Sequence, residues 1–171
     1  MTIIIDDAGS GDLLLGVVIG AYRPNPLDFT YDMIEVHYFQ PPQFARKAYL
    51  QQASRIVFAL LRRLQRQADE AIQICRSYLF DQAVDDLIHT YGADHVHRVI
   101  VEGEAQRLTE TAYLDELRNL GYHPLTHRET RRAKSFFHML HWLKTHPDKL
   151  KYAKTGWPRL TRYPEFRALL R

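Results

Sequence analysis

The sequence is poor in cysteine and has no long apolar run. Cys75 is the only cysteine of the 171 residues, which excludes an intrachain disulfide and a zinc site built from several cysteines. No apolar stretch approaches the roughly 20 residues that a membrane-spanning helix needs, and no basic and then apolar leader opens the chain. We therefore expect a cytoplasmic protein that does not enter the membrane.

Negative charge is scarce in the last part of the chain. Residues 123–171 contain 12 Lys and Arg against 3 Asp and Glu, whereas residues 1–122 contain 11 against 17, so the net charges are +9 and −6. Such a split marks either an interaction tail for nucleic acid or a basic segment that packs on the acidic body of its own chain. We expect a core at 1–122 and a basic helical extension at 123–171 packed on it, within one domain.

The opening of the chain predicts the centre of a sheet. The unbroken β-branched run at 3–5 is typical of a strand buried on both faces, and a second apolar run at 13–21 is expected to fold back against it. Asp6 and Asp7 therefore lie at a strand tip, pointing to opposite faces. Carboxylates there are costly unless they are paired, hydrogen-bonded or bound to a cation such as Mg²⁺. Capping of the following turn is the alternative.

Hydrophobic periodicity and turn residues predict the order of the remaining elements. A strand-helix-strand unit joins parallel neighbours, so the first, fourth and fifth strands should lie side by side with their carboxyl ends at one edge. The expected elements are a strand at 33–39, a helix at 44–67, a strand at 71–75, a helix at 78–91, a strand at 95–101, a helix from about 104 to 120 and a helix at 130–145.

This order of elements, with acid at the tip of the first strand, resembles the ribonuclease H-like superfamily over residues 2–121. Residues 5–11, Ile-Asp-Asp-Ala-Gly-Ser-Gly, are similar to the Asp-Glu-Ala-Gly-Arg-Gly opening of type 2 ribonucleases H. They also resemble the Asp-x-Gly-Ser phosphate loop of actin-like and apyrase-type phosphotransferases. The resemblance implies an α/β fold of βββαβαβα order with a mixed five-stranded sheet flanked by helices, and a Mg²⁺ or Mn²⁺ cofactor.

The resemblance also implies a set of site residues. Asp6 matches the family's first metal-ligating aspartate, and Asp7 matches the acid beside it. Glu102 and Glu104 are the best stand-ins for the final acid. The implied catalytic residues are Asp6, Asp7, Glu102 and Glu104, the implied metal ligands are Asp6, Asp7 and Glu104, and the implied phosphate-binding residues are Gly9, Ser10, Gly11 and Arg76.

Several positions depart from the family pattern. The carboxylate expected at the end of the fourth strand is replaced by Cys75-Arg76-Ser77, and Asp81 lies one helical turn further on. Ser10 stands where type 2 enzymes have arginine. Arg76 could instead neutralise Asp6 and leave no place for a metal, and the helix dipole alone accounts for acids at the start of a helix.

Two basic segments are candidate nucleic-acid contacts. The helix at 44–67 contains no acid, and Arg55, Arg62 and Arg66 share one face at steps of seven and four. Guanidinium groups pair well with phosphate oxygens, but a solvated face is the alternative. Residues 149–164 interleave bases and aromatics, which suits stacking on nucleobases or, alternatively, packing on the body or on another subunit.

Three functions are compatible with these residues. The first is a metal-dependent phosphodiesterase or nuclease acting on nucleic acid. The second is a non-catalytic ribonuclease H-like module that binds nucleic acid or a protein partner. The third is a phosphotransfer or nucleotide-binding protein that uses residues 9–11 as a phosphate cradle, although the chain offers no second lobe to close over a nucleotide. We expect the first, and an oligomer is compatible with each.

Overall fold

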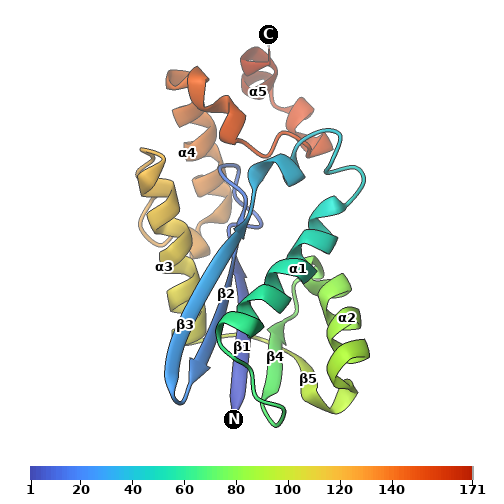
Figure 1. Cartoon of the computed structure of the whole chain (residues 1–171). Coiled ribbons are helices and arrows are strands. Elements are labelled where there is room, and N and C mark those ends of the chain that lie inside the picture. Colours follow the sequence, from blue (N-terminus) through green and yellow to red (C-terminus); the bar gives the residue numbers. More distant parts are fainter. Residues whose placement is uncertain (171) are drawn as a thin grey trace.

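The computed structural model describes residues 1–170, except the side chain of residue 129. Five strands form one open sheet in the order β3-β2-β1-β4-β5 (Figure 1). Neighbours β1 and β2 are antiparallel, as are β2 and β3, whereas β1, β4 and β5 run parallel. The fold is therefore α/β with a mixed five-stranded sheet, as predicted. The strands are β1 (Thr2–Ala8), β2 (Val17–Pro24), β3 (Leu27–Ile34), β4 (Ala71–Cys75) and β5 (Val96–Val99).

Helices cover both faces of this sheet. Figure 1 shows α1 and α2 on one side and α3 on the other, with α4 and α5 beyond the end of the sheet toward which β1 runs. The helices are α1 (Ala48–Arg63), α2 (Asp81–Tyr91), α3 (Glu104–Asn119), α4 (Arg132–Thr145) and α5 (Pro164–Leu169). Within the described part of the chain, no helix is both long and apolar enough to cross a membrane.

Alternation along β1 divides the core in two. Ile3 and Ile5 are fully buried in a cluster with side chains of α1 and α2. Ala8 belongs to a second cluster, with side chains of α3 and of the C-terminal segment. Because successive side chains in a strand point to opposite faces, Asp6 follows Ala8 toward α3, and Asp7 follows the isoleucines toward α1 and α2.

Two predicted boundaries were wrong near the second hairpin. The third strand is 27–34 rather than 33–39, because the turn after Pro24 is tight and β3 pairs with β2 along its whole length, from Leu27 to Ile34. Residues 36–39 form a short 3₁₀ helix instead. Helix α1 begins at 48 rather than 44, after Lys47 in the left-handed region with φ 53°.

The C-terminal segment packs on the core. An isolated β-bridge joins Leu14 to Ala153, next to a hydrogen bond from the Lys154 amide to the Leu13 carbonyl at 2.8 Å. The amide of Leu15 donates to the Tyr152 carbonyl at 2.7 Å. Residues 150–154 therefore hold the loop that joins β1 to β2, and this loop carries the glycine-rich motif.

Candidate functional site

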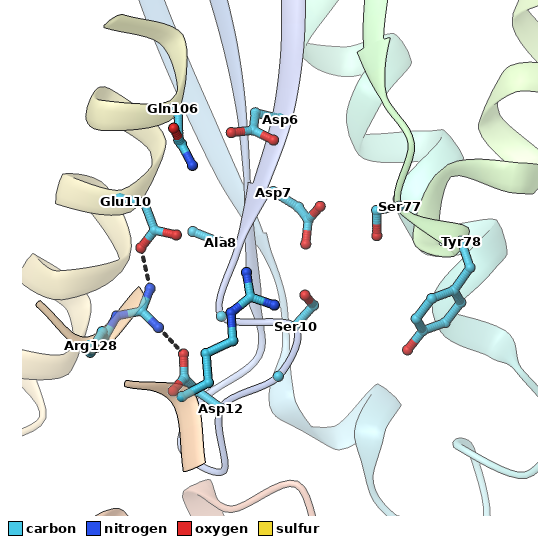
Figure 2. Close-up of a pocket in the computed structure, with 13 residues that line it drawn as sticks. Asp6, Asp7, Ala8, Ser10, Asp12, Ser77, Tyr78, Gln106, Glu110 and Arg128 are labelled. Atoms are coloured by element: carbon cyan, nitrogen blue, oxygen red, sulfur yellow. Dashed lines mark hydrogen bonds and ion pairs between the residues drawn. The ribbon is translucent and has the colours of Figure 1, made fainter. Parts of the chain in front are cut away.

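A cavity of about 340 Å³ lies at the carboxyl end of β1 (Figure 2). Its wall is formed by the tip of β1 and the loop after it, the segment after β4, one face of α3, and Arg128 and Arg132 from the C-terminal segment. Four carboxylates line it: Asp6, Asp7, Asp12 and Glu110. This excess of acid over base makes the cavity a candidate cation site.

Asp6 is a buried carboxyl without a basic partner. Its residue is 8 % exposed, and it forms no ion pair within the part of the chain that the structure describes. Burial raises the pKa of the Asp6 carboxyl from 3.8 to about 6, and the negative charges of Asp7 and Glu110 add to the increase. A bound cation would favour the charged form of the carboxyl and oppose this shift.

Asp7 accepts a hydrogen bond from the thiol at the end of β4. Cys75 Sγ donates to Asp7 Oδ1 at 3.2 Å, and ligand atoms of Asp6, Asp7 and Cys75 all lie within 4.8 Å of one another. Burial and the neighbouring carboxylates raise the pKa of the Cys75 thiol far above neutrality. In the metal-free protein the thiol is therefore protonated at neutral pH, and its hydrogen bond orients Asp7.

The donor set fits a hard divalent ion. Mg²⁺ prefers oxygen ligands and is usually held by one or two carboxylates, with waters and substrate phosphates completing its coordination. Asp6 and Asp7 supply two carboxylates at the mouth of one cavity.

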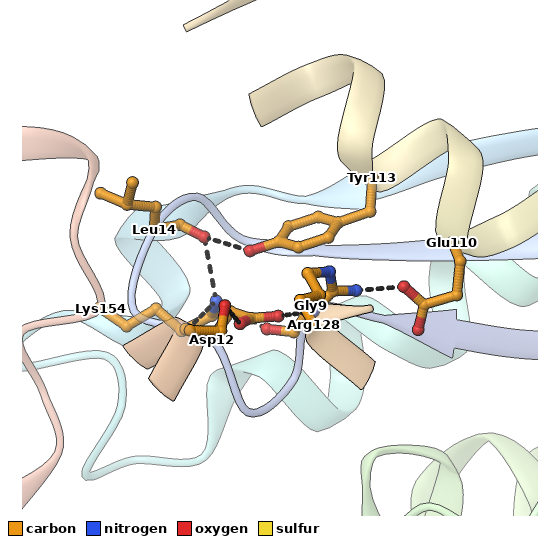
Figure 3. A network of polar contacts seen from close by, with 8 residues as sticks. Gly9, Asp12, Leu14, Glu110, Tyr113, Arg128 and Lys154 are labelled. Atoms are coloured by element: carbon orange, nitrogen blue, oxygen red, sulfur yellow. Dashed lines mark hydrogen bonds and ion pairs between the residues drawn. The ribbon is translucent and has the colours of Figure 1, made fainter. Parts of the chain in front are cut away.

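The other two carboxylates are occupied by one buried guanidinium. Arg128 Nη1 donates to Asp12 Oδ2 and Nη2 donates to Glu110 Oε2 (Figure 3). The guanidinium lies over the Tyr113 ring, 4.7 Å from its centroid, and Ser135 Oγ donates to Asp12 Oδ1 at 3.3 Å. Arg128 therefore pairs with Asp12 and Glu110 and not with Asp6 or Asp7.

A buried lysine binds backbone carbonyls of the glycine-rich loop. Lys154 is fully buried, and its Nζ donates to the carbonyls of Gly9 at 2.9 Å, Asp12 at 2.7 Å and Leu14 at 3.4 Å (Figure 3). Burial lowers the pKa of Lys154 to about 7, against the pull of Asp12. Tyr113 Oη donates to the Leu14 carbonyl at 2.8 Å, so the loop is clamped from two sides.

Lys154→Met should loosen this loop. The substitution leaves buried carbonyls without their donor, and we expect it to lower the free energy of unfolding by about 1–3 kcal/mol, the usual cost of one such group. Urea denaturation measures the loss, and limited proteolysis should show new cleavage within 9–16. Lys134→Met, at an exposed position, is the control. Unchanged stability and an unchanged cleavage pattern would show that the loop is held without Lys154.

Gly9 is needed where the loop leaves β1. Its φ is +90°, and a Cβ at this position would lie 2.5 Å from the Tyr113 ring. A side chain is therefore excluded both by backbone conformation and by contact. Gly9, Ser10 and Gly11 all line the cavity.

The structure does not bring the predicted Glu102, Glu104 and Arg76 to this cavity. Glu102 is exposed, and Glu104 pairs with Arg107 at 2.5 Å one turn along α3. The buried face of α3 passes through Thr109 and Tyr113, so the rotation of the helix turns position 110, and not 104, toward β1.

The arginine and the aspartate considered after β4, Arg76 and Asp81, also lie outside the cavity. Arg76 is exposed, does not line the cavity and does not pair with Asp6. Asp81 pairs with Arg98 at 2.6 Å. The salt bridge between Arg76 and Asp6 that the sequence left open is therefore not formed.

The basic face predicted for 44–67 is divided in the structure. Arg55 and Arg62 line a shallow cavity between α1 and α2. Arg66 lies beyond the end of α1, where its guanidinium is 4.3 Å from the centroid of the Tyr91 ring and donates to the Glu70 carbonyl at 2.6 Å. Arg66 thus contacts its own chain.

Sequence reasoning missed Asp12, Glu110, Arg128 and Lys154. One local signal existed for Glu110. Gln106 and Glu110 are four residues apart beside the buried face of α3, so both side chains project from the same side of the helix. No local signal existed for Arg128 or Lys154, which reach the site from more than 100 residues away.

Fold and site together define an α/β protein with an acidic cavity at the carboxyl end of the central strand of a mixed sheet. The chain matches no protein-family model, and no curated protein or solved structure matches it.

Proposed function

We propose that the protein is a divalent-metal-dependent hydrolase of the ribonuclease H-like class, which cleaves phosphodiester bonds in nucleic acid. The observation that carries the proposal is the pair Asp6 and Asp7. They stand at the tip of the central strand, line one cavity and have no basic partner among residues 1–170. The strand order β3-β2-β1-β4-β5, with only β1, β4 and β5 parallel, supports the ribonuclease H-like assignment.

Each group in the cavity has a defined part in this proposal. Asp6 and Asp7 would hold Mg²⁺ or Mn²⁺, which supplies an activated water and stabilises charge on the phosphate when bound. The Cys75 thiol orients Asp7 through its hydrogen bond. The loop at 9–11 would offer backbone to an anion, and Arg132 adds a guanidinium to the same wall.

A non-catalytic module that binds nucleic acid or a protein partner is the second candidate. The observation that favours it is Cys75 in the position of the family's fourth-strand carboxylate, because two-metal chemistry needs several shared acids. The pairing of Glu110 with Arg128 further reduces the number of carboxylates facing the ion. The two candidates differ in whether bound metal leads to cleavage.

Titration calorimetry with Mg²⁺ and Mn²⁺ tests the proposal. We expect Asp6→Asn and Asp7→Asn each to weaken metal binding about 100-fold or more. Removing a group that only supports a ligand already lowers metal affinity by about 10- to 100-fold, and a direct ligand should matter at least as much. Glu104→Gln is the matched control and should bind metal as the wild type does, because Glu104 lies outside the cavity. Cleavage of single-stranded and duplex DNA and RNA is followed on the same proteins.

The outcomes separate the candidates. Absence of metal binding at millimolar concentrations removes the hydrolase proposal. Metal binding without cleavage of any of the four substrates, together with retention of nucleic acid, supports the non-catalytic module. Metal binding and cleavage lost together in both aspartate variants support the hydrolase.

A further inference from the structure

A second cavity, of about 200 Å³, lies in the C-terminal segment and is lined mainly by aromatic rings. We call it the aromatic cavity and define it by Phe136, Phe137, Trp157, Tyr163 and Arg159. Phe136 and Trp157 are stacked with an interplanar angle of 26°, and Phe137 meets Tyr163 edge to face at 85°. Phe137 is 49 % exposed, an unusual amount for a ring beside such a cluster.

The aromatic cavity adjoins the acidic cavity through the start of α4. Arg132 lines the acidic cavity, and the next residue, Ala133, lines the aromatic one. The first turn of α4 contributes to the walls of both cavities. A ligand of several linked units could therefore occupy both.

Positive charge surrounds the connection between the cavities. Arg131, Arg132 and Lys134 are exposed in or next to the first turn of α4, which contains no acid, and exposed Arg159 lies on the wall of the aromatic cavity. A cationic ligand is disfavoured by these charges. The combination of flat rings with guanidinium and ammonium groups instead suits an anion that carries planar bases.

We propose that the aromatic cavity binds an unpaired nucleobase of a nucleic acid strand whose neighbouring phosphate reaches the acidic cavity along Arg132. The inference rests on the proposed function for the class of ligand, and it adds that the preferred substrate is single-stranded or has an unpaired end. Bases in a duplex are stacked on each other and offer no free face to a protein ring, whereas single-stranded bases stack on aromatic side chains.

Trp157 provides a direct readout of this site. The chain has two tryptophans, and Trp142 lies apart from the cavity, stacked on His146. In a Trp142→Phe protein, we expect oligothymidylate to quench the fluorescence of Trp157 in EDTA, where no cleavage occurs. An abasic oligonucleotide of equal length keeps the phosphates and should quench little. The salt concentration is held fixed, since phosphate contacts depend strongly on it.

A substitution at the exposed ring tests the contribution of stacking. Phe137→Ala should weaken oligothymidylate binding about 5- to 100-fold, as expected for loss of one stacked base. Tyr31→Ala, which removes an exposed ring on β3 far from α4, should leave the affinity unchanged. Thermal melts show whether each variant is folded, and the half-exposed position of Phe137 makes the substitution tolerable.

The results distinguish this inference from the proposed function. Equal quenching by abasic and base-carrying oligonucleotides, equal affinity for duplex and single strand, or full affinity in folded Phe137→Ala each overturns the nucleobase site and leaves metal-dependent hydrolysis standing. Base-dependent quenching in a protein that binds no metal supports the nucleobase site and removes the hydrolase.

Discussion

Arg128→Met is expected to lower the free energy of unfolding by about 3–5 kcal/mol, the cost of breaking a buried ion pair by removing one partner. Arg128 is 4 % exposed and donates to both Asp12 and Glu110. Asp12 is also 4 % exposed, so its carboxylate would lose the guanidinium while remaining away from water. The substitution also removes the contact between the guanidinium and the Tyr113 ring.

Urea denaturation of the metal-free protein measures this effect. Arg118→Met is the matched control, because Arg118 pairs with Asp115 on the surface of α3 and is half exposed. Such a pair contributes about 0.3–0.5 kcal/mol. Arg128→Lys keeps the positive charge but cannot donate to both carboxylates as the guanidinium does. Its loss of unfolding free energy should lie between those of the two methionine variants, and it provides the test if Arg128→Met does not fold. A loss below about 1 kcal/mol would contradict a structural role for the network.

The sequence predicted the elements whose signals are local and repeated. The segments at 3–5 and 71–75 became neighbouring parallel strands, because β-branched residues favour a buried strand and the helix between the two segments supplies the crossover. The start of α1 was misplaced because a proline pair at 41–42 is an acceptable helix opening, yet here the chain makes a further turn before Lys47. A left-handed residue of this kind has no sequence signature.

The candidate site was predictable only where it is contiguous. Asp6, Asp7 and residues 9–11 could be found because strand end, acid and glycine follow one another. Glu110 required the rotation of α3 about its axis, which depends on packing of Thr109 against Gly20 across the sheet. Arg128 and Lys154 required the path of the C-terminal segment, and the charge split at residue 122 indicated only that such a segment could fold back.

The placement of Arg128 and Lys154 changes how the basic segment should be understood. Both residues are buried and both contact the loop after β1, through side-chain and backbone oxygens respectively. Part of the positive charge of the extension therefore organises the acidic site of the same chain. Other bases of the extension, such as Arg131, Arg132 and Lys134 at the start of α4, are exposed.

Asp6→Asn is expected to stabilise the metal-free protein by about 3 kcal/mol at pH 7, since each pKa unit corresponds to about 1.4 kcal/mol. The pKa of the Asp6 carboxyl is raised from 3.8 to about 6 by burial. Between these values the folded protein binds a proton that the unfolded chain has lost, so stability falls as pH rises from about 4 to about 6. Above pH 6 the full cost of the buried charge remains.

The difference in the free energy of unfolding between Asp6→Asn and wild type should therefore be small near pH 4, increase up to about pH 6 and stay constant above it. Denaturation in EDTA across this range measures it, with Asp69→Asn at an exposed position as the control. Added Mg²⁺ should then raise the stability of the wild type and not of the variant, because only a site that binds the ion gains by mass action. A variant less stable than wild type at pH 7 would mean that ionised Asp6 is held by its own contacts, and the cavity would lose the uncompensated charge on which cation binding depends.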